Sequence, residues 1–374
     1  MSTPTPELVH DADREQLRQI VRKFVGAKMP ITAARQSAEL GSAFDPSVWK
    51  QMAEELGLQG MAIGEEHGGA GQSFVELAIV MEEFGRALAG GPFLSTVVLA
   101  AGALEISGDE AACQRYLPAI AQGTLIATVA VSGVASLQAT HRDGAWALSG
   151  DAGFVLAGAD ADVVLLFADT ESGISLFAVD AGAEGLQSTP LEVLDMTRPQ
   201  ANLSFADTPA ALVGTLGDGA RVHTLVLQRA CVAIASEQIG GASQVLELAV
   251  DYVKQRYQFG RAVASFQAIK HKAADMLVQL EQARSTAIYA AWAVTGAPED
   301  LTIASSLAKL HCSNAFSKLS GDAIQLLGGI GFTWEHDAHL YYKRAASTAQ
   351  LFGDPGHHRR VLTETLGLTK GANA

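Results

Sequence analysis

The feature that most constrains the fold is a change in hydrophobic periodicity, which occurs twice along the chain. Up to about residue 122 apolar residues recur at helical spacing, as at Leu17, Ile20, Val21 and Phe24. From about residue 124 to 213, short apolar runs alternate with Gly, Asp and Ser, which is typical of strands joined by tight turns. After residue 218 helical spacing returns. The order predicts an α+β multidomain chain.

Three domains follow from these changes. We expect an N-terminal α-helical domain over residues 1–122, a middle β-domain over 123–220 and a C-terminal four-helix bundle over 221–374. Within them, Asp45 is a predicted helix N-cap, with Pro46 at the first helical position. Strands are predicted over 145–148, 163–167 and 174–179, with a hairpin turn over 142–144.

Charge and composition exclude several classes of protein. Lys+Arg 26 against Asp+Glu 40 gives a formal charge of -14, and no basic stripe is present, so binding along a nucleic-acid backbone is not expected. Residues 1–14 are polar and acidic, which predicts no signal peptide, and the longest apolar runs fall short of the roughly 20 residues of a membrane helix. We expect a soluble, cytoplasmic protein.

The three cysteines, Cys113, Cys231 and Cys312, are far apart and have no metal-ligand spacing. We therefore expect free buried thiols in a reducing cytoplasm and no metal site.

Two segments in the last third carry residue types suited to an anionic ligand. In residues 252–261, Arg256 lies one turn before Gly260, where we expect the helix to end. In residues 325–335, three glycines occupy four positions, so backbone amides could approach a ligand closely. Each segment also has a purely structural interpretation, as a solvated cation at a helix end and as a turn.

Taken together, these segments resemble the acyl-CoA dehydrogenase family in order and spacing. Residues 60–71, 115–123 and 194–198 also resemble segments of that family. The resemblance implies a flavoprotein that removes hydrogen from carbons α and β of an acyl-CoA thioester, where a carboxylate takes the α-proton and FAD the β-hydride. It further implies that FAD lies across a dimer interface, with its pyrophosphate and adenosine held by Arg256, Gln258, Phe259, Gln325, Gly328 and Gly329.

The sequence departs from the family where the catalytic base is expected. The usual base is a Glu before a glycine near the C-terminus, and Phe352 stands in that place. Other members carry a Glu-Arg pair on the first long helix after the β-domain, but here the pair is Gln228-Arg229, which leaves Arg229 as a candidate substrate-binding residue. Two carboxylates remain open. Glu237, about two turns further on, is either a replacement base or a polar contact between helices, and Asp354 is either a base or a turn residue.

The side of the site that faces the flavin ring departs too. The family's loop after residues 127–131 reads Ser132-Gly133-Val134-Ala135-Ser136 here. Phe154 replaces the indole that touches flavin, and Leu156 offers no hydroxyl.

These departures predict one subunit of a heteromeric acyl-CoA dehydrogenase that completes the FAD site of a partner carrying the base. Residues 331–335 and 352–354 resemble the bacterial steroid-degradation type, which implies a bulky, steroid-like acyl-CoA. The expected electron acceptor is an electron-transfer flavoprotein. The alternatives are a self-sufficient homomer with a relocated base, and a non-catalytic scaffold that has kept the fold.

Overall fold

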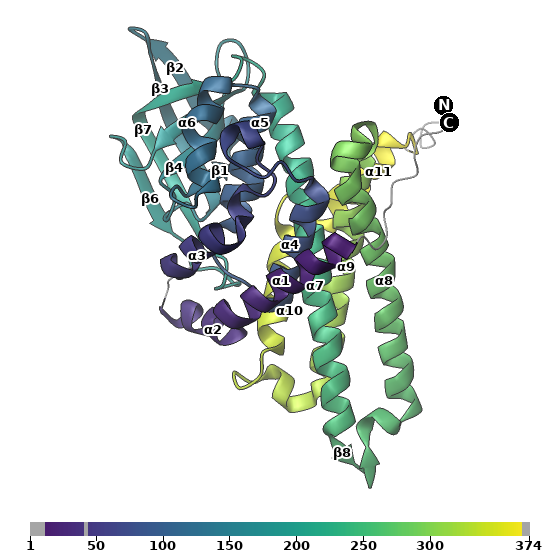
Figure 1. Ribbon diagram of the computed structural model, residues 1–374. Helices are drawn as coiled ribbons and strands as arrows, with labels where there is room; N and C mark the ends of the chain where they lie inside the picture. Colours follow the sequence, from purple (N-terminus) through teal and green to yellow (C-terminus); the bar gives the residue numbers. More distant parts are fainter. Residues whose placement is uncertain (1–11, 41–43, 369–374) are drawn as a thin grey trace. The chain divides into compact units, whose positions relative to one another are not determined.

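The computed structural model describes residues 12–40 and 44–368, so residues 1–11, on which the expectation of no signal peptide depends, lie outside it (Figure 1). Its internal contacts divide the chain into two compact units. Within the described residues, the sheet unit comprises 35–40, 44–73 and 90–230, and the helical unit comprises 12–34, 74–89 and 231–368. The division into three domains stays a prediction. None of the described helices combines the length and apolar character that a membrane span requires.

The sheet unit begins with short helices that have clear sequence signals. At the start of α3 (Pro46–Leu56) the Asp45 carboxylate accepts a hydrogen bond from the Ser47 amide at 2.8 Å, and Pro46 takes the first helical position, so the predicted cap is confirmed. Within this unit, the helices that follow α3 are η1 (Leu58–Gly60), η2 (Glu65–His67), the π-helix η3 (Leu94–Ala100), α5 (Ala101–Ser107) and α6 (Glu110–Ala121).

A mixed seven-stranded sheet forms the rest of this unit. Its strands are β1 (Ala127–Ala130), β2 (Leu137–Arg142), β3 (Ala145–Leu156), β4 (Val163–Ala168), β5 (Ser175–Asp180), β6 (Leu186–Pro190) and β7 (Gln200–Val213), with the short helix η4 (Val134–Ser136) before β2. The order is β1-β4-β5-β7-β3-β2 with β6 also on β7, and β1 and β4 are parallel while the other pairs are antiparallel. The three predicted strand runs are confirmed in β3, β4 and β5.

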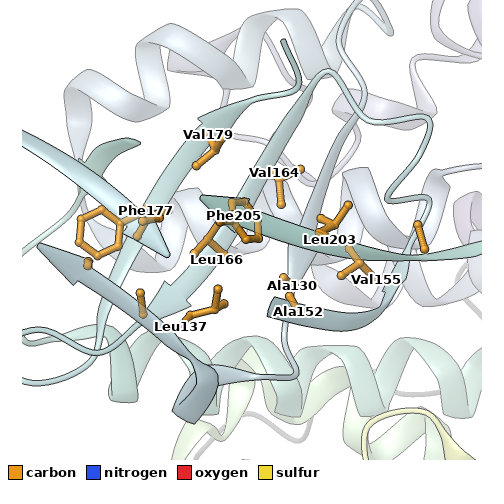
Figure 2. Packing of buried hydrophobic residues seen from close by; sticks show 14 residues of the cluster. Ala130, Leu137, Ala152, Val155, Val164, Leu166, Phe177, Val179, Leu203 and Phe205 are labelled. Carbon is orange, nitrogen blue, oxygen red and sulfur yellow. The ribbon is translucent and has the colours of Figure 1, made fainter. Parts of the chain in front are cut away.

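The turn between β2 and β3 is confirmed where the sequence predicts it. Asp143 and Gly144 have positive φ values of 52° and 84°, as a two-residue hairpin turn requires. The buried side chains of the strands form one apolar cluster, in which Leu137, Leu166, Phe177 and Leu203 are fully buried (Figure 2). Burying one such side chain stabilises the fold by about 1.5–3 kcal/mol.

The helical unit contains the long helices. Its elements are α1 (Ala12–Lys28), α4 (Phe74–Ala87), β8 (Tyr257–Gln258), β9 (Arg261–Ala262), η5 (Val263–Ser265), α8 (Gln267–Gly296), η6 (Pro298–Asp300), α9 (Leu301–Leu327), η7 (Gly328–Phe332), α10 (Ala338–Gln350) and α11 (Pro355–Thr365). Helix α7 (Gly219–Gln255) begins in the sheet unit and continues into this one, and α2 (Ile31–Leu40) likewise has residues in both units.

The helical spacing that returns after residue 218 places apolar residues on the buried faces of α7 and α9, with Tyr252 of α7 half-buried. Residues Ala242, Val245, Ala249 and Val253 of α7 and Ala308, Cys312, Ala315 and Leu319 of α9 are all buried. In α1, by contrast, Ile20 is 42% exposed, because it lies at the edge of a narrower stripe formed by Val21, Phe24 and Val25.

Helices α4 and α7 cross in backbone contact. A Cβ atom at Gly85 would overlap the carbonyl oxygen of Glu237, and one at Gly240 would overlap that of Glu82. Only glycine permits this approach, so α4 covers the middle of α7 directly. The three cysteines are buried free thiols, as expected.

Candidate functional site

The segment after α7 differs from the sequence expectation in one respect. We expect the helix to end at Gly260, but α7 ends at Gln255 and Arg256 is the first residue beyond it. Strands β8 and β9 then form a hairpin, with Phe259 and Gly260 at its turn at φ 53° and 76°. The cause is local, because a two-residue turn with glycine at its second position favours a hairpin over further helix.

This hairpin presents large side chains to solvent. Phe259 is 91% exposed, and Arg256 and Gln258 are exposed as well. Within the described residues Arg256 makes no salt bridge. Phe259 packs edge-on against Phe266, with ring centroids 6.2 Å apart. Phe259 and Arg256 are therefore both open to contact with another molecule.

The glycines at the end of α9 have two different roles. A Cβ at Gly328 or Gly329 would meet no atom within 4 Å, so this backbone is open to a ligand. Gly331 is buried, and its Cβ would lie 2.9 Å from that of Leu327, so its role is packing. Gln325, one turn before Gly329, is exposed.

The helix order brings these two segments to the same end of the bundle. Helix α7 ends in the hairpin, α8 returns, and α9 follows after the three-residue η6, so α7 and α9 run toward the same end of the bundle (Figure 1). An exposed guanidinium, open glycine amides and an exposed aromatic ring are groups that fit a diphosphate attached to an aromatic cofactor. The chain therefore fits the FAD contacts implied by its resemblance.

The C-terminal loop, residues 351–354, keeps a defined shape although it lacks a base. Phe352 stands at φ 60°, a conformation rarely adopted by a bulky residue. Buried Lys309 donates from Nζ to the carbonyl oxygens of Ala349 and Gly353, each at 3.1 Å, and His358 Nε2 lies 3.2 Å from that of Phe352. Burial lowers the pKa of Lys309 to about 8.

Asp354 is the N-cap of α11. Its carboxylate accepts a hydrogen bond from the His357 amide at 2.6 Å, and this bond lowers the pKa of Asp354. The observation supports the turn interpretation of Asp354 over the base.

Glu237 lies inside the helical unit. Its side chain is 3% exposed and its Oε1 lies 2.8 Å from Nη1 of Arg344, which is 1% exposed. Since α4 also crosses α7 at this point, the geometry favours a polar contact between helices over a base.

Arg229 has a partner that the sequence did not reveal. Its Nη1 lies 3.7 Å from Oε2 of Glu105 in α5, and the two side chains are 27% and 31% exposed. Burial raises the pKa of Glu105 against the opposing effects of Arg229 and a backbone hydrogen bond from Gly64. Burial likewise lowers the pKa of the Arg229 guanidinium, although the Glu105 carboxylate opposes this shift. In the sequence, the sign that pointed to Glu105 was its position as a lone carboxylate near the end of the apolar run 93–106.

The segment expected to face a flavin ring still presents an aromatic side chain. Phe154 is 69% exposed at φ 58°, in an irregular part of β3 where the register shifts between Ala152 and Val155. The Ser132 hydroxyl donates to the Gly153 carbonyl, which ties the 132–136 loop to β3. Strained, exposed residues of this kind cluster at ligand-binding sites.

Comparisons with known proteins assign the family. Residues 11–124 match the acyl-CoA dehydrogenase N-terminal domain, and residues 217–367 match the acyl-CoA dehydrogenase C-terminal domain. The chain is 33% identical over 350 residues to acyl-CoA dehydrogenase IpdE2 of Mycolicibacterium smegmatis, covering 94% of this chain and 97% of that protein.

Solved structures agree. The ChsE4-ChsE5 complex from Mycobacterium tuberculosis matches with a TM-score of 0.89 and 27% identity, over 97% of this chain and 99% of that one. A variant of the Tcur3481-Tcur3483 steroid ACAD matches with a TM-score of 0.87 and 27% identity, over 96% of this chain and 99% of that one. The chain belongs to the acyl-CoA dehydrogenase family, whose members are FAD-dependent oxidoreductases acting on the CH–CH bond of acyl-CoA thioesters.

Proposed function

We propose that this chain is one subunit of a heteromeric acyl-CoA dehydrogenase and completes an FAD site shared with a second, similar subunit. One combination of features carries the proposal. The surface suited to FAD, with exposed Arg256 and open Gly328 and Gly329, is retained, whereas Phe352 occupies the usual base position. A subunit that completes its neighbour's cofactor site needs the FAD surface and does not need the usual base at position 352.

Two matched structures support a heteromer and a bulky substrate. One is a complex of two named chains, ChsE4 and ChsE5, and the other is described as a steroid ACAD. We infer a steroid-like acyl-CoA as substrate and an electron-transfer flavoprotein as acceptor.

In the proposed assembly the residues of this chain have distinct tasks. Arg256 pairs with the diphosphate, Gly328 and Gly329 offer backbone amides, and Phe259 and Gln258 contact the adenosine part. Bound FAD supplies the hydride acceptor of the reaction. Arg229 binds near the acyl-CoA, beside Glu105.

The test is to purify the chain alone and together with the product of a neighbouring dehydrogenase-like gene. We expect a colourless chain alone and a yellow complex that oxidises a CoA thioester of a steroid carboxylic acid with an artificial electron acceptor. A yellow, active chain with one FAD per subunit and no partner would establish the homomer instead. Absence of flavin under both conditions would establish the scaffold.

A further inference from the structure

A carboxylate from a different helix stands beside Arg229. On α7 the residue before Arg229 is Gln228, which cannot take up a proton. In space, however, Arg229 faces Glu105 of α5 at 3.7 Å. The fold therefore assembles a Glu–Arg pair that does not exist in the linear sequence.

The local structure of α5 sets this contact. Gly102 and Glu105 are one turn apart and lie on the same face, and a Cβ at Gly102 would be 3.8 Å from Nη1 of Arg229. Arg229 thus extends along this face of α5. The helix continues directly from the π-helix η3, an uncommon conformation that changes which residues share a face and is frequent at functional sites.

The surroundings of Glu105 suit a proton acceptor. The carboxylate is only partly buried, so an atom of a ligand can reach it. The Gly64 amide donates a hydrogen bond to it, and Arg229 lies 3.7 Å away as its counter-ion. Burial raises its pKa above the ordinary value, which brings a general base nearer to neutral pH. His67, from the same loop as Gly64, is buried close by, and its Nδ1 has no hydrogen-bond partner within the described chain.

We propose that Glu105, paired with Arg229, accepts the α-proton of an acyl-CoA bound by this chain. The α C–H bond breaks, its proton adds to a Glu105 oxygen, and its electron pair enters the forming Cα–Cβ double bond. The oxidant is the FAD of the family reaction, which takes the hydride leaving Cβ. The inference rests on the proposed acyl-CoA dehydrogenase function, and it locates in this chain a base that the sequence predicted only in a partner.

The experiment separates proton removal from oxidation. A 3-thia-acyl-CoA has sulfur in place of its β-carbon, so it can exchange an α-proton but cannot lose a hydride. The co-purified complex is incubated with this thioester in D2O, and deuterium uptake is followed by mass spectrometry. The variants are Glu105→Gln, Glu105→Asp and the matched control Glu110→Gln, which removes a neighbouring exposed carboxylate.

We expect Glu105→Gln to slow exchange by about 100-fold or more, with the thioester dissociation constant and the melting temperature little changed. Glu105→Asp should keep measurable exchange, and Glu110→Gln should match wild type. The wild-type exchange rate should rise with pH as the Glu105 carboxyl, whose pKa is raised, loses its proton. This increase should be absent in Glu105→Gln.

Exchange by Glu105→Gln within about threefold of wild type would overturn the assignment of Glu105 as the proton acceptor. The proposed heteromer would still stand in that case if the wild-type complex binds FAD and oxidises acyl-CoA. A loss of exchange that merely follows a loss of thioester binding would also overturn it. If the wild-type complex neither binds FAD nor oxidises acyl-CoA, the proposed function fails, and this inference fails with it.

Discussion

Arg344 and Glu237 form an ion pair that is almost completely removed from solvent, with Nη1 2.8 Å from Oε1 and both side chains no more than 3% exposed. The pair joins α10 to α7 at the place where α4 crosses in backbone contact. Charges buried this deeply persist only because they are paired, so each holds the other in the fold.

Replacing Glu237 by Gln should therefore affect stability more than chemistry. The change leaves the buried Arg344 cation without its carboxylate, and breaking such a pair costs about 3–5 kcal/mol. We expect the urea midpoint of unfolding to fall accordingly, while turnover per FAD-loaded complex stays within a few-fold of wild type.

The matched control is Glu281→Gln on α8. Glu281 is 55% exposed and pairs with Arg284 at 3.3 Å, so its loss should cost less than about 1 kcal/mol. If Glu237→Gln kept full stability but lost turnover by several orders of magnitude, Glu237 would be the base.

Arg256→Ala tests the cofactor surface. If the guanidinium pairs with the FAD diphosphate, its removal costs about 1.5–3 kcal/mol, or roughly 10–150-fold in the dissociation constant of FAD. Flavin fluorescence after dilution of the complex measures the release. Lys254→Ala is the control, since Lys254 is an exposed cation on the last turn of α7. Equal FAD retention in both variants would make Arg256 an ordinary solvated cation.

Much of the fold could be predicted because its signals are local. Asp45-Pro46 specifies a helix start, and Asp143-Gly144 specifies a hairpin through its backbone preferences alone. The end of α7 was predicted wrongly at Gly260 because a glycine serves equally well as a helix stop and as a hairpin turn. Choosing between them requires the pairing partner, Ala262, which lies beyond the glycine.

The site shows the same limit more clearly. The exposure of Arg256 and Gly328 could be predicted, because the sequence motifs place each residue near the end of a long helix. The pairing of Glu105 with Arg229 and of Glu237 with Arg344 could not be predicted, since the partners lie on helices far apart in sequence. No periodicity within one helix reports which charged residue of another helix it meets.

Phe352→Glu tests whether the C-terminal loop alone limits the chemistry. Lys309 and His358 hold the loop by its carbonyl groups, so the new side chain should point where Phe352 points now. We expect little acyl-CoA oxidation by the isolated chain, because the segment over residues 131–156 also departs from the family. Phe352→Gln is the control for the loss of the ring. Robust oxidation by the Glu variant alone would show that the flavin side of the site is intact.

Beneath the same loop, His358 lies buried between the loop and α7. Its Nε2 is 3.2 Å from the Phe352 carbonyl oxygen and 3.8 Å from Sγ of Cys231. Burial, the nearby Lys309 cation and His357 lower the pKa of His358 from 6.5 to about 4. The folded chain therefore keeps this imidazole neutral in a pH range where the unfolded chain protonates it.

The sign of the resulting pH dependence follows from proton binding. Between pH 6.5 and about 4 the unfolded state binds one more proton than the folded state, so stability is full above pH 6.5 and falls as the pH drops through this window. The loss reaches about 3 kcal/mol at the lower end. We expect urea unfolding of His358→Gln to lose that part of the acid dependence. His357→Gln, at the exposed neighbouring position, should retain most of it, because burial and Lys309 still lower the pKa of His358. Identical acid profiles for wild type and His358→Gln would show that the imidazole is protonated in the folded chain and that the loop tolerates its charge.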